Sequence, residues 1–345
     1  MKYFPNVIVP FLVSLLATPI AIRVAKRFDI LDHPGHRKIH KRAIPLLGGF
    51  VIYCGFIAGL VAHREVIPLL LPIIIGATVM VIIGLIDDIR GLSAQFRFVV
   101  ELLVVLVLVK FGVCVSFLPA GFWGDLAEIM ITAFWVVGVT NACNYLDGLD
   151  GLATGSAIVN LFCFSVILYH TNQPELAIMA MVLTASCLGF FPYNFQKAKI
   201  FLGDAGSTFL GFTLACIAVS GNWAEDNVAR LSIPILILGV PIFDMIFTTI
   251  LRIKEEKVKT LVEWLHYGGK DHFHHYLVDI GLHVQGAVAF IYLLTFSLGI
   301  SAIMLSNDNA VEALLSLSQA SIIFIVVAVL IVVGKRRRSG WNITN

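Results

Sequence analysis

The chain has 345 residues, of which 59% are hydrophobic and 13% charged, and its formal net charge is +2. Soluble domains contain roughly 45–50% apolar and about 25% charged residues, so this composition excludes a soluble globular enzyme, a disordered chain and a nucleic-acid-binding module. The six cysteines are widely spaced without a CxxC pair, which predicts neither a disulfide framework nor a metal site. The composition instead indicates a membrane protein.

Apolar stretches that could each cross a membrane recur along the whole chain, since a crossing takes about 20 apolar residues. We predict an all-α polytopic membrane protein with about eleven transmembrane helices, forming a single integral-membrane domain over 1–345. The first stretch has no small-residue cleavage motif, so we expect it to remain as a helix. The predicted spans are 4–22, 43–62, 66–86, 97–112, 127–143, 152–170, 175–193, 205–222, 231–251, 285–305 and 314–334.

The distribution of basic residues predicts the orientation of these spans. With the N-terminus outside and the C-terminus in the cytoplasm, twenty of the 24 Lys and Arg residues fall in cytoplasmic segments, as the positive-inside rule requires. Nearly every polar motif falls on that side, so we expect the chemistry to be done by cytoplasmic loops. The cytoplasmic segments are 23–42, 87–97, 144–151, 194–204, 252–284 and 335–345.

Three of these loops carry aspartates at helix ends. They are Asp87 and Asp88 in GLIDDIRG, Asp147 and Asp150 in NYLDGLDG, and Asp204 in FLGDAGST. Adjacent carboxylates repel one another unless a cation or protons compensate. All-oxygen ligation favours Mg²⁺ or Mn²⁺, with substrate phosphate and water completing the shell. The alternative is that these aspartates cap helices or lie in solvated turns, with Asp204 as a simple N-cap.

Two basic loops supply candidate phosphate contacts. The loop 252–284 contains GGKDHFHHYL, in which Lys270 precedes three histidines, His272, His274 and His275. We expect these side chains to contact phosphate or sugar, while a structural loop and a metal site remain alternatives. In the first loop Arg37, Lys38 and His40 are phosphate-contact candidates, the alternative being a positive-inside anchor at lipid headgroups. Gly48 and Gly49 begin the next span and predict close backbone packing.

Two acidic residues fall inside predicted spans, Asp244 in the ninth and Glu101 in the fourth. Such residues are costly in a membrane and are functional candidates by default. They keep open a second class of function, an ion-coupled transporter. A helix-packing or loop-anchoring role for Asp244 is an equally good interpretation, and the acidic motifs gather on one face rather than along a path.

The combined motifs resemble the polyprenyl-phosphate N-acetylhexosamine-1-phosphate transferase superfamily, and within it the WecA/TagO-like branch, the undecaprenyl-phosphate GlcNAc-1-phosphate transferases. The resemblance covers essentially the whole chain. It is carried by Asp32, Pro34, Arg37, Lys38, His40, Pro45, Gly48, Gly49, Asp87, Asp88, the run NACNYLDGLDG, Asn194, the run KIFLGDAGS and the run HFHH.

The resemblance implies a reaction in a bacterial inner membrane, with the active site facing the cytoplasm. A UDP-N-acetylhexosamine would give its sugar-1-phosphate to undecaprenyl phosphate, releasing UMP in a Mg²⁺-dependent reaction that starts a lipid-linked cell-surface glycan. GlcNAc is the expected sugar. Another N-acetylhexosamine, or the UDP-MurNAc-pentapeptide of a related branch, remains an alternative donor. A homodimer is compatible with the sequence, which does not predict an oligomeric state.

The resemblance also implies roles for individual positions. Asp204 would be a metal ligand, and Asp147 would lie beside the metal and the diphosphate as a further ligand. Asp87 or Asp88 would bind or deprotonate the lipid phosphate. The three histidines would lie near the sugar and diphosphate as catalytic residues. The uridine would be held by Gly148, Leu149, Asp150, Asn194 and Phe201, with Phe201 stacking on the base.

Overall fold

The computed structural model describes residues 4–34, 42–260, 271–307 and 310–341, together with positions 263, 264, 267 and 269. The described residues are helical almost throughout, with one small antiparallel sheet, and the predicted all-α polytopic class is confirmed. The chain divides into two compact units, Met1–Asn222 and Trp223–Asn345, and each is described by itself below. The single domain expected over 1–345 stays a prediction.

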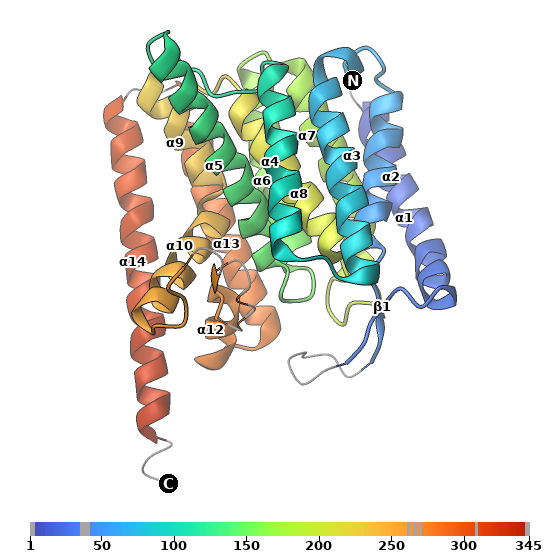
Figure 1. Ribbon diagram of the computed structural model, residues 1–345, viewed down its shortest axis with the longest axis vertical. Coiled ribbons are helices and arrows are strands. Elements are labelled where there is room, and N and C mark those ends of the chain that lie inside the picture. Colours follow the sequence, from blue (N-terminus) through green and yellow to red (C-terminus); the bar gives the residue numbers. More distant parts are fainter. Residues whose placement is uncertain are drawn as a thin grey trace. The chain divides into compact units, whose positions relative to one another are not determined.

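The first unit is a bundle of helices with a two-stranded hairpin between its first two helices (Figure 1). In the hairpin, Leu31 pairs with Pro45 and Asp32 pairs with Ile44. The elements are α1 (Phe4–Arg27), β1 (Leu31–Asp32), β2 (Ile44–Pro45), α2 (Gly48–Val61), α3 (Ile67–Arg90), α4 (Ala94–Lys110), α5 (Phe122–Leu146), α6 (Leu152–His170), α7 (Pro174–Asn194) and α8 (Gly203–Ser220).

Helix α8 lies at the centre of this unit, and small residues let its neighbours approach closely. Its membrane-crossing window is 83% buried. A Cβ at Gly49 of α2 would clash with the backbone of Gly206, and one at Gly84 of α3 would clash with the backbone of Ala205. The expected close packing at Gly49 is thereby confirmed. Both crossings lie near the start of α8, so they fix the ends of α2 and α3 beside it.

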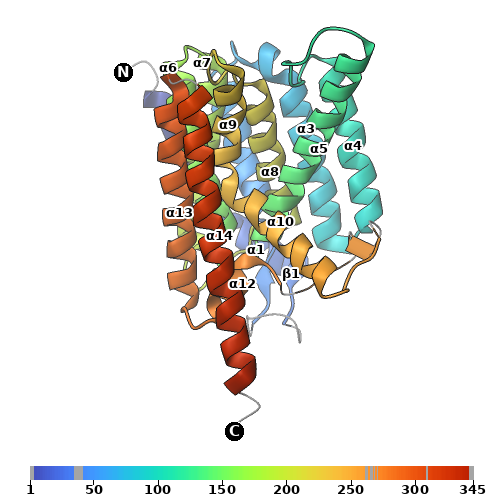
Figure 2. The same ribbon diagram turned by 90° about the vertical axis from the view of Figure 1, so that its left-hand side faces the viewer.

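The second unit begins with a broken helix. Its elements are α9 (Asn227–Ile237), α10 (Gly239–Lys254), α12 (Phe273–Asp279), α13 (Val284–Met304), the short 3₁₀ turn η1 (Leu305–Asn307) and α14 (Ala310–Trp341). The span expected over 231–251 is not one continuous helix, because α9 and α10 are bent from one another by 76° (Figure 2). Pro241 has no N–H to donate to the carbonyl of Ile237, so the helical hydrogen bonding is interrupted between α9 and α10.

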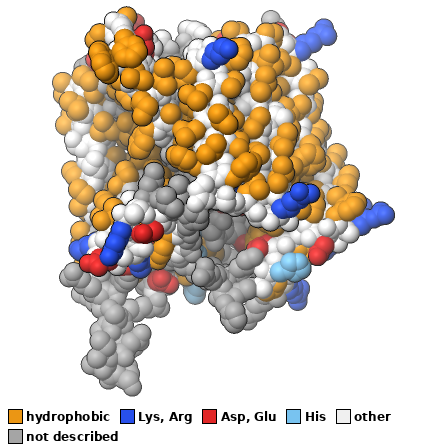
Figure 3. Space-filling model, in the orientation of Figure 1, with side chains coloured by type: hydrophobic (Ala, Val, Ile, Leu, Met, Phe, Trp, Pro, Cys, Tyr) orange, Lys and Arg blue, Asp and Glu red, His pale blue; other side chains and the backbone are white. Residues whose placement is uncertain are grey.

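The predicted count of eleven spans is not confirmed. Eight described helices are long and apolar enough to cross a membrane, or nine when the bent pair counts as one span. Helix α2 has 14 residues, about 21 Å at 1.5 Å per residue, against a hydrocarbon core of about 30 Å. It begins at Gly48 because Ile44–Pro45 form a strand, whereas the predicted span began at 43. Hydrophobic side chains cover the outer faces of α3 and α4, with charged ones near the helix ends (Figure 3).

Candidate active site

The first turn of α8 is capped by a side chain from α3. Oδ1 of Asp88 accepts the N–H of Asp204 at 2.8 Å, and Oδ2 accepts the N–H of Ala205 at 3.1 Å. Gly203 adopts a φ of +74°, and a Cβ there would lie 2.5 Å from Oδ2 of Asp88, so this position requires glycine. Asp88 is therefore the cap of α8. The simple N-cap considered for Asp204 is wrong, since α8 has no capping side chain of its own.

Asp87, the neighbour of Asp88, faces a basic partner. Its Oδ1 accepts the N–H of Leu92 and its Oδ2 accepts a hydrogen bond from Nη1 of Arg97, both at 2.5 Å. The same Arg97 nitrogen lies 3.6 Å from Oδ1 of Asp204. One guanidinium from α4 thus lies between carboxylates from α3 and α8. Because neighbouring helical residues point about 100° apart, Asp87 and Asp88 serve different partners.

The end of α5 contributes an amide and a further carboxylate. Nδ2 of Asn144 donates to Oδ1 of Asp204 at 2.6 Å and to Oγ of Ser207 at 2.8 Å, which ties α5 to α8. Asp147 follows α5, and no hydrogen bond to its carboxylate occurs among the described residues. Burial, together with the charges of Asp204 and Asp150, raises the pKa of Asp147 to about 7. We call Asp87, Asp88, Asp147, Asp150 and Asp204 the acidic cluster.

The segment before α8 is held by side chains from two directions. Oδ2 of Asp150 accepts the N–H of Ala198 at 2.9 Å. Asn194 is 2% exposed, accepts a hydrogen bond from Thr154 at 2.9 Å and donates to the carbonyl of Ile200 at 3.0 Å. The Asn194 amide, expected to hold uridine, thus fixes the backbone that leads to α8.

The hairpin packs against the same segment through its backbone. The N–H of Phe201 donates to the carbonyl of Pro45 at 2.8 Å, and the carbonyl of Phe201 accepts the N–H of Gly48 at 3.1 Å. The Phe201 ring is half-buried, Leu149 is buried, and Gly148 is exposed. The residues expected at the uridine therefore lie on the two loops that flank Asp147 and Asp204, in the same unit as the acidic cluster.

Glu101 lies one turn after Arg97 along α4. It is 5% exposed and accepts a hydrogen bond from Nδ2 of Asn141 at 2.6 Å. A cavity of about 10 Å³, room for about one water molecule, is lined by Arg97, Glu101, Asp204 and Thr208 among others. Glu101 therefore has a hydrogen-bond partner on α5 and lines the same cavity as Asp204 of the acidic cluster.

The second unit holds the histidine segment against α10. Asp244, which is fully buried, accepts the N–H of Phe273 at 2.5 Å through Oδ1, and its Oδ2 lies 2.9 Å from Nδ1 of His272. The hydroxyl of Thr248 bonds the carbonyl of Asp271 at 3.2 Å. The loop-anchoring interpretation of Asp244 agrees with these contacts.

Arg252 provides a second attachment. Its Nε and Nη2 donate to the two carboxylate oxygens of Asp271 at 3.0 and 2.7 Å, and Nη2 lies 3.2 Å from Nε2 of His272. Burial alone would raise the pKa of Asp271, but the hydrogen bonds and charge of Arg252 outweigh it and lower this pKa below its ordinary value. Arg252 also lies 4.7 Å from the ring centre of Tyr267.

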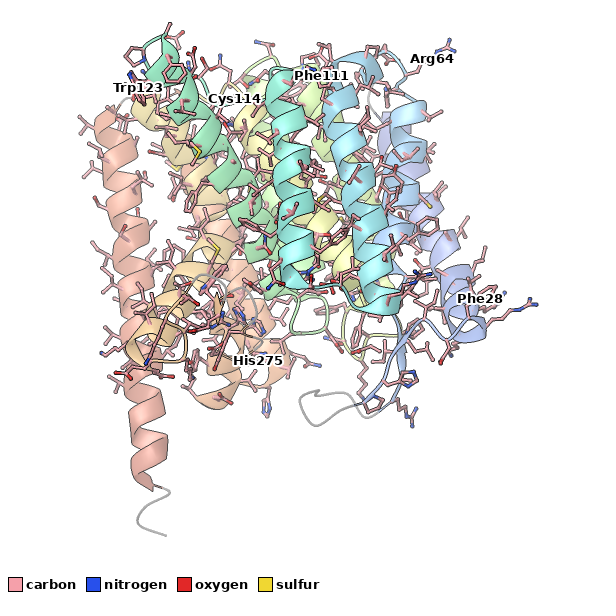
Figure 4. All side chains as sticks on the ribbon, viewed as in Figure 1. Phe28, Arg64, Phe111, Cys114, Trp123 and His275 are labelled. Carbon is pink, nitrogen blue, oxygen red and sulfur yellow. The ribbon has the colours of Figure 1, made fainter. Side chains whose placement is uncertain are left out.

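The other two histidines follow on α12. His274 is fully buried, and neither ring nitrogen has a hydrogen-bond partner among the described residues. Burial lowers the pKa of His274 well below its usual range. His275 is half-buried, with its ring 4.2 Å from that of His274 (Figure 4). His274 is therefore a neutral imidazole.

Four residues expected to contact phosphate lie outside the described residues, namely Arg37, Lys38, His40 and Lys270. Three further polar residues of these sites were not predicted from the sequence, namely Arg97, Asn144 and Asp271. A signal existed for the first two, because polar residues in apolar helices are costly and usually paired. Arg97 precedes Glu101 by four residues, which places both on one helix face.

A divalent metal fits the acidic cluster in a limited way. Among the described residues, no group of three or more His, Cys, Asp or Glu side chains is arranged to hold a metal. Mg²⁺ is usually bound by one or two carboxylates, with substrate phosphate and water completing its shell. Asp204 and Asp147 meet that smaller requirement, since the charge of Asp204 helps to raise the pKa of Asp147 and the Asp204 side chain is 36% exposed.

Comparisons with known proteins show the family to which this chain is related. A model of glycosyl transferase family 4 matches residues 70–222, which span α3 to α8. The chain is 36% identical over 312 residues, 88% of its length and 86% of the relative's, to a probable undecaprenyl-phosphate N-acetylglucosaminyl 1-phosphate transferase of Bacillus subtilis. It is 30% identical to a decaprenyl-phosphate N-acetylglucosaminephosphotransferase of Mycobacterium leprae, covering 82% of this chain and 78% of that one.

A third relative is the undecaprenyl-phosphate alpha-N-acetylglucosaminyl 1-phosphate transferase of Escherichia coli K12. It is 29% identical over 307 residues, which cover 85% of this chain and 82% of the relative. These matches extend well beyond α3 to α8 into the second unit, and therefore include chain from both units.

Proposed function

Because the chain belongs to glycosyl transferase family 4, we propose that it transfers GlcNAc-1-phosphate from UDP-GlcNAc to undecaprenyl phosphate. An oxygen of the lipid phosphate attacks the β-phosphorus of the nucleotide sugar, the bond to the α-phosphate oxygen breaks, and UMP leaves. The printed activities of the relatives support this reaction. The observation that carries it is the acidic cluster, where the ends of α3 and α8 bring the carboxylates of Asp87 and Asp204 to Arg97.

The substrates and the cluster are all negatively charged, so the site must supply positive charge. Bound Mg²⁺, or Mn²⁺ in its place, would neutralise the diphosphate and polarise its phosphorus. Asp204 and Asp147 are the residues that would hold it. Arg97 already neutralises Asp87, which leaves the carboxylates of Asp204 and Asp147 for the cation.

The neighbouring carboxylates of α3 divide their work. Asp88 is committed to the amides of α8, and we assign it to positioning Asp204. Asp87 ends an apolar helix where a lipid headgroup can approach, and its partner Arg97 is 28% exposed. We assign the lipid phosphate to the Asp87–Arg97 pair, in which the partly exposed guanidinium of Arg97 contacts the phosphate and Asp87, whose side chain is 7% exposed, orients that guanidinium.

The nucleotide is assigned to the two loops that flank Asp147 and Asp204. Gly148, Leu149 and Asp150 form one side, and the Phe201 ring provides a stacking surface for uracil. Asn194 acts by holding Ile200 and thereby Phe201. His274 and His275, with Arg37, Lys38, His40 and Lys270, are the proposed contacts of the sugar and phosphates.

The experiment that tests this function is UMP release by the purified chain from a panel of donors with undecaprenyl phosphate and Mg²⁺. The panel contains UDP-GlcNAc, UDP-GalNAc, a UDP-6-deoxy-N-acetylhexosamine and UDP-MurNAc-pentapeptide. We expect UDP-GlcNAc to react fastest. Preference for another donor would correct the sugar, and absence of lipid-dependent UMP release from all four would overturn the function and favour the transporter class.

We also propose that the acidic cluster faces the cytoplasm of a bacterial inner membrane, with the N-terminus outside. The positive-inside distribution supports this orientation. A cysteine at the exposed position Gly148 should resist a membrane-impermeant thiol reagent in intact cells, whereas one at the exposed position Ala120 should react. The reverse pattern would overturn the orientation.

A further inference from the structure

We infer that His272 is a positioning residue and not a proton-transfer group. With Asp244, Arg252 and Asp271 it forms a closed set of contacts, here called the buried network, that fixes the start of α12 on α10. The inference rests on the proposed function in one respect, that the histidine segment contacts substrate. It assigns that contact to the residues after His272.

The contacts of His272 specify its tautomer. Its Nδ1 lies 2.9 Å from the Asp244 carboxylate, which can only accept, so Nδ1 carries the hydrogen. Its Nε2 lies 3.2 Å from Nη2 of Arg252, which can only donate, so Nε2 accepts. A proton on both nitrogens would place two donors against each other. Both ring nitrogens are therefore used inside the protein, Nδ1 as a donor and Nε2 as an acceptor.

The buried network leaves no room for a substrate at His272. The exposed fractions of Asp244, Arg252, Asp271 and His272 are 0, 1, 5 and 7%. A general acid or base must come within hydrogen-bond reach of the group whose proton it moves. His272 could do so only by releasing Asp244 or Arg252, and either release would strand a buried charge.

The buried network instead attaches a short segment of the chain to α10. The N–H of Phe273 also bonds Asp244, and Arg252 holds Asp271 on the other side of His272. Three consecutive residues are thus attached to α10, immediately before His274 and His275. The network therefore fixes where those two rings lie.

A comparison of substitutions at His272 separates positioning from proton transfer. The amide of His272→Gln can donate to Asp244 and accept from Arg252 but cannot shuttle a proton, whereas His272→Ala can do neither. We expect His272→Ala to lower kcat roughly tenfold to a hundredfold, the effect of losing a hydrogen bond to a charged group. We expect His272→Gln to recover most of that loss. If the Gln variant is as inactive as the Ala variant while its segment remains protected, the inference is overturned.

Hydrogen exchange supplies a readout that does not depend on activity. The peptide covering 271–279 should be protected in the native chain, because the Phe273 amide is bonded to Asp244. Asp244→Ala and His272→Ala should both speed its exchange, and His272→Gln should restore protection. Native-like protection in Asp244→Ala would overturn the buried network.

A matched control is Ser232→Ala on α9, which removes a buried hydroxyl, 1% exposed, from the same unit. It should change neither the exchange of 271–279 nor the response to substitutions at His272. Failure of the proposed function is distinguishable, because it would appear as absent UMP release by the native chain with the exchange pattern intact.

Discussion

The acidic cluster and the buried network use the same kinds of side chain to opposite ends. In the buried network, Asp271 and Asp244 are matched by Arg252 and by the His272 ring, and every member is at most 7% exposed. In the acidic cluster, the ion pairs formed by described residues all involve Arg97, and the Asp204 side chain is 36% exposed. Buried polar groups that each have a partner mark a scaffold, whereas carboxylates that outnumber the cations beside them mark a site for cations and phosphates.

The largest expected effect is loss of turnover on removing the charge of Asp204, a proposed metal ligand in the acidic cluster. Asp204→Asn keeps the shape and the hydrogen bond from Asn144 but removes a full charge. We expect kcat to fall by about 10³-fold or more, with the folded state retained. Steady-state UMP release and thermal unfolding measure the two effects. Thr208→Val, one turn further along α8, serves as control, and activity within tenfold of the native chain for Asp204→Asn would contradict the assignment.

The converse experiment removes the cation of the buried network. Arg252→Ala leaves Asp271 as an uncompensated buried charge, and we expect it to lower the free energy of unfolding by about 3–5 kcal/mol. Detergent-solubilised protein followed by denaturant unfolding gives the value. The double variant Arg252→Met with Asp271→Leu should recover most of the loss, because it removes both charges. A loss under about 1 kcal/mol for Arg252→Ala would show that the pair is not buried as described.

Removing the cation of the acidic cluster should give the opposite pattern. Arg97→Ala is expected to change the free energy of unfolding by about 1 kcal/mol or less, because Arg97 is partly exposed and its ion pairs are screened. Its kcat/KM should fall roughly tenfold to a hundredfold, through the lost charge-assisted hydrogen bond to Asp87. Arg97→Lys tests whether charge alone suffices. Equal losses of stability for the alanine variants at Arg97 and Arg252 would erase the distinction between the two regions.

The last prediction is a pH-dependent increase in the free energy of unfolding when Asp147 is replaced by Asn. The pKa of Asp147 is about 7 in the folded chain and about 4 in an unfolded one. The folded chain therefore holds a proton that the unfolded chain has released, and stability falls as the pH rises from about 4 to about 7. Asp147→Asn should be more stable than the native chain at pH 8 with a chelator present, by at least about 1 kcal/mol, since a shift of about 3 pKa units sets an upper bound of about 4 kcal/mol. At pH 4 the difference from the native chain should vanish, and a difference independent of pH would refute this cause.

Much of the acidic cluster was predictable, because charge counting put the aspartate motifs on one face. The division of labour within it was not. Asp88 caps α8 because Gly203 leaves space for its carboxylate, and nothing local to either motif indicates that contact. Arg97 was missed because one basic residue at the start of an apolar helix reads equally well as a positive-inside charge.

The bend between α9 and α10 shows a different limit of prediction. Apolar residues run through 231–251 with little interruption, so hydropathy gives one span. The polar residues Asp244, Thr248 and Arg252 recur every four positions, which places them on one face of α10, and that face is the buried one. Their partners lie beyond the reach of local pattern analysis, because Asp271 and His272 are 19 and 20 residues further along the chain than Arg252.

The glycine crossings at α8 have a consequence for how this chain tolerates change. A methyl group at Gly84 would push α3 away from Ala205, and Asp88, one turn further along, would lose its hold on the first amides of α8. Random mutagenesis should therefore recover inactive alleles at Gly49, Gly84 and Gly206, positions that are packed against neighbouring helices. Amino-acid substitution along α8 is thus limited by packing space, just as substitution at the aspartates is limited by the need for their charge.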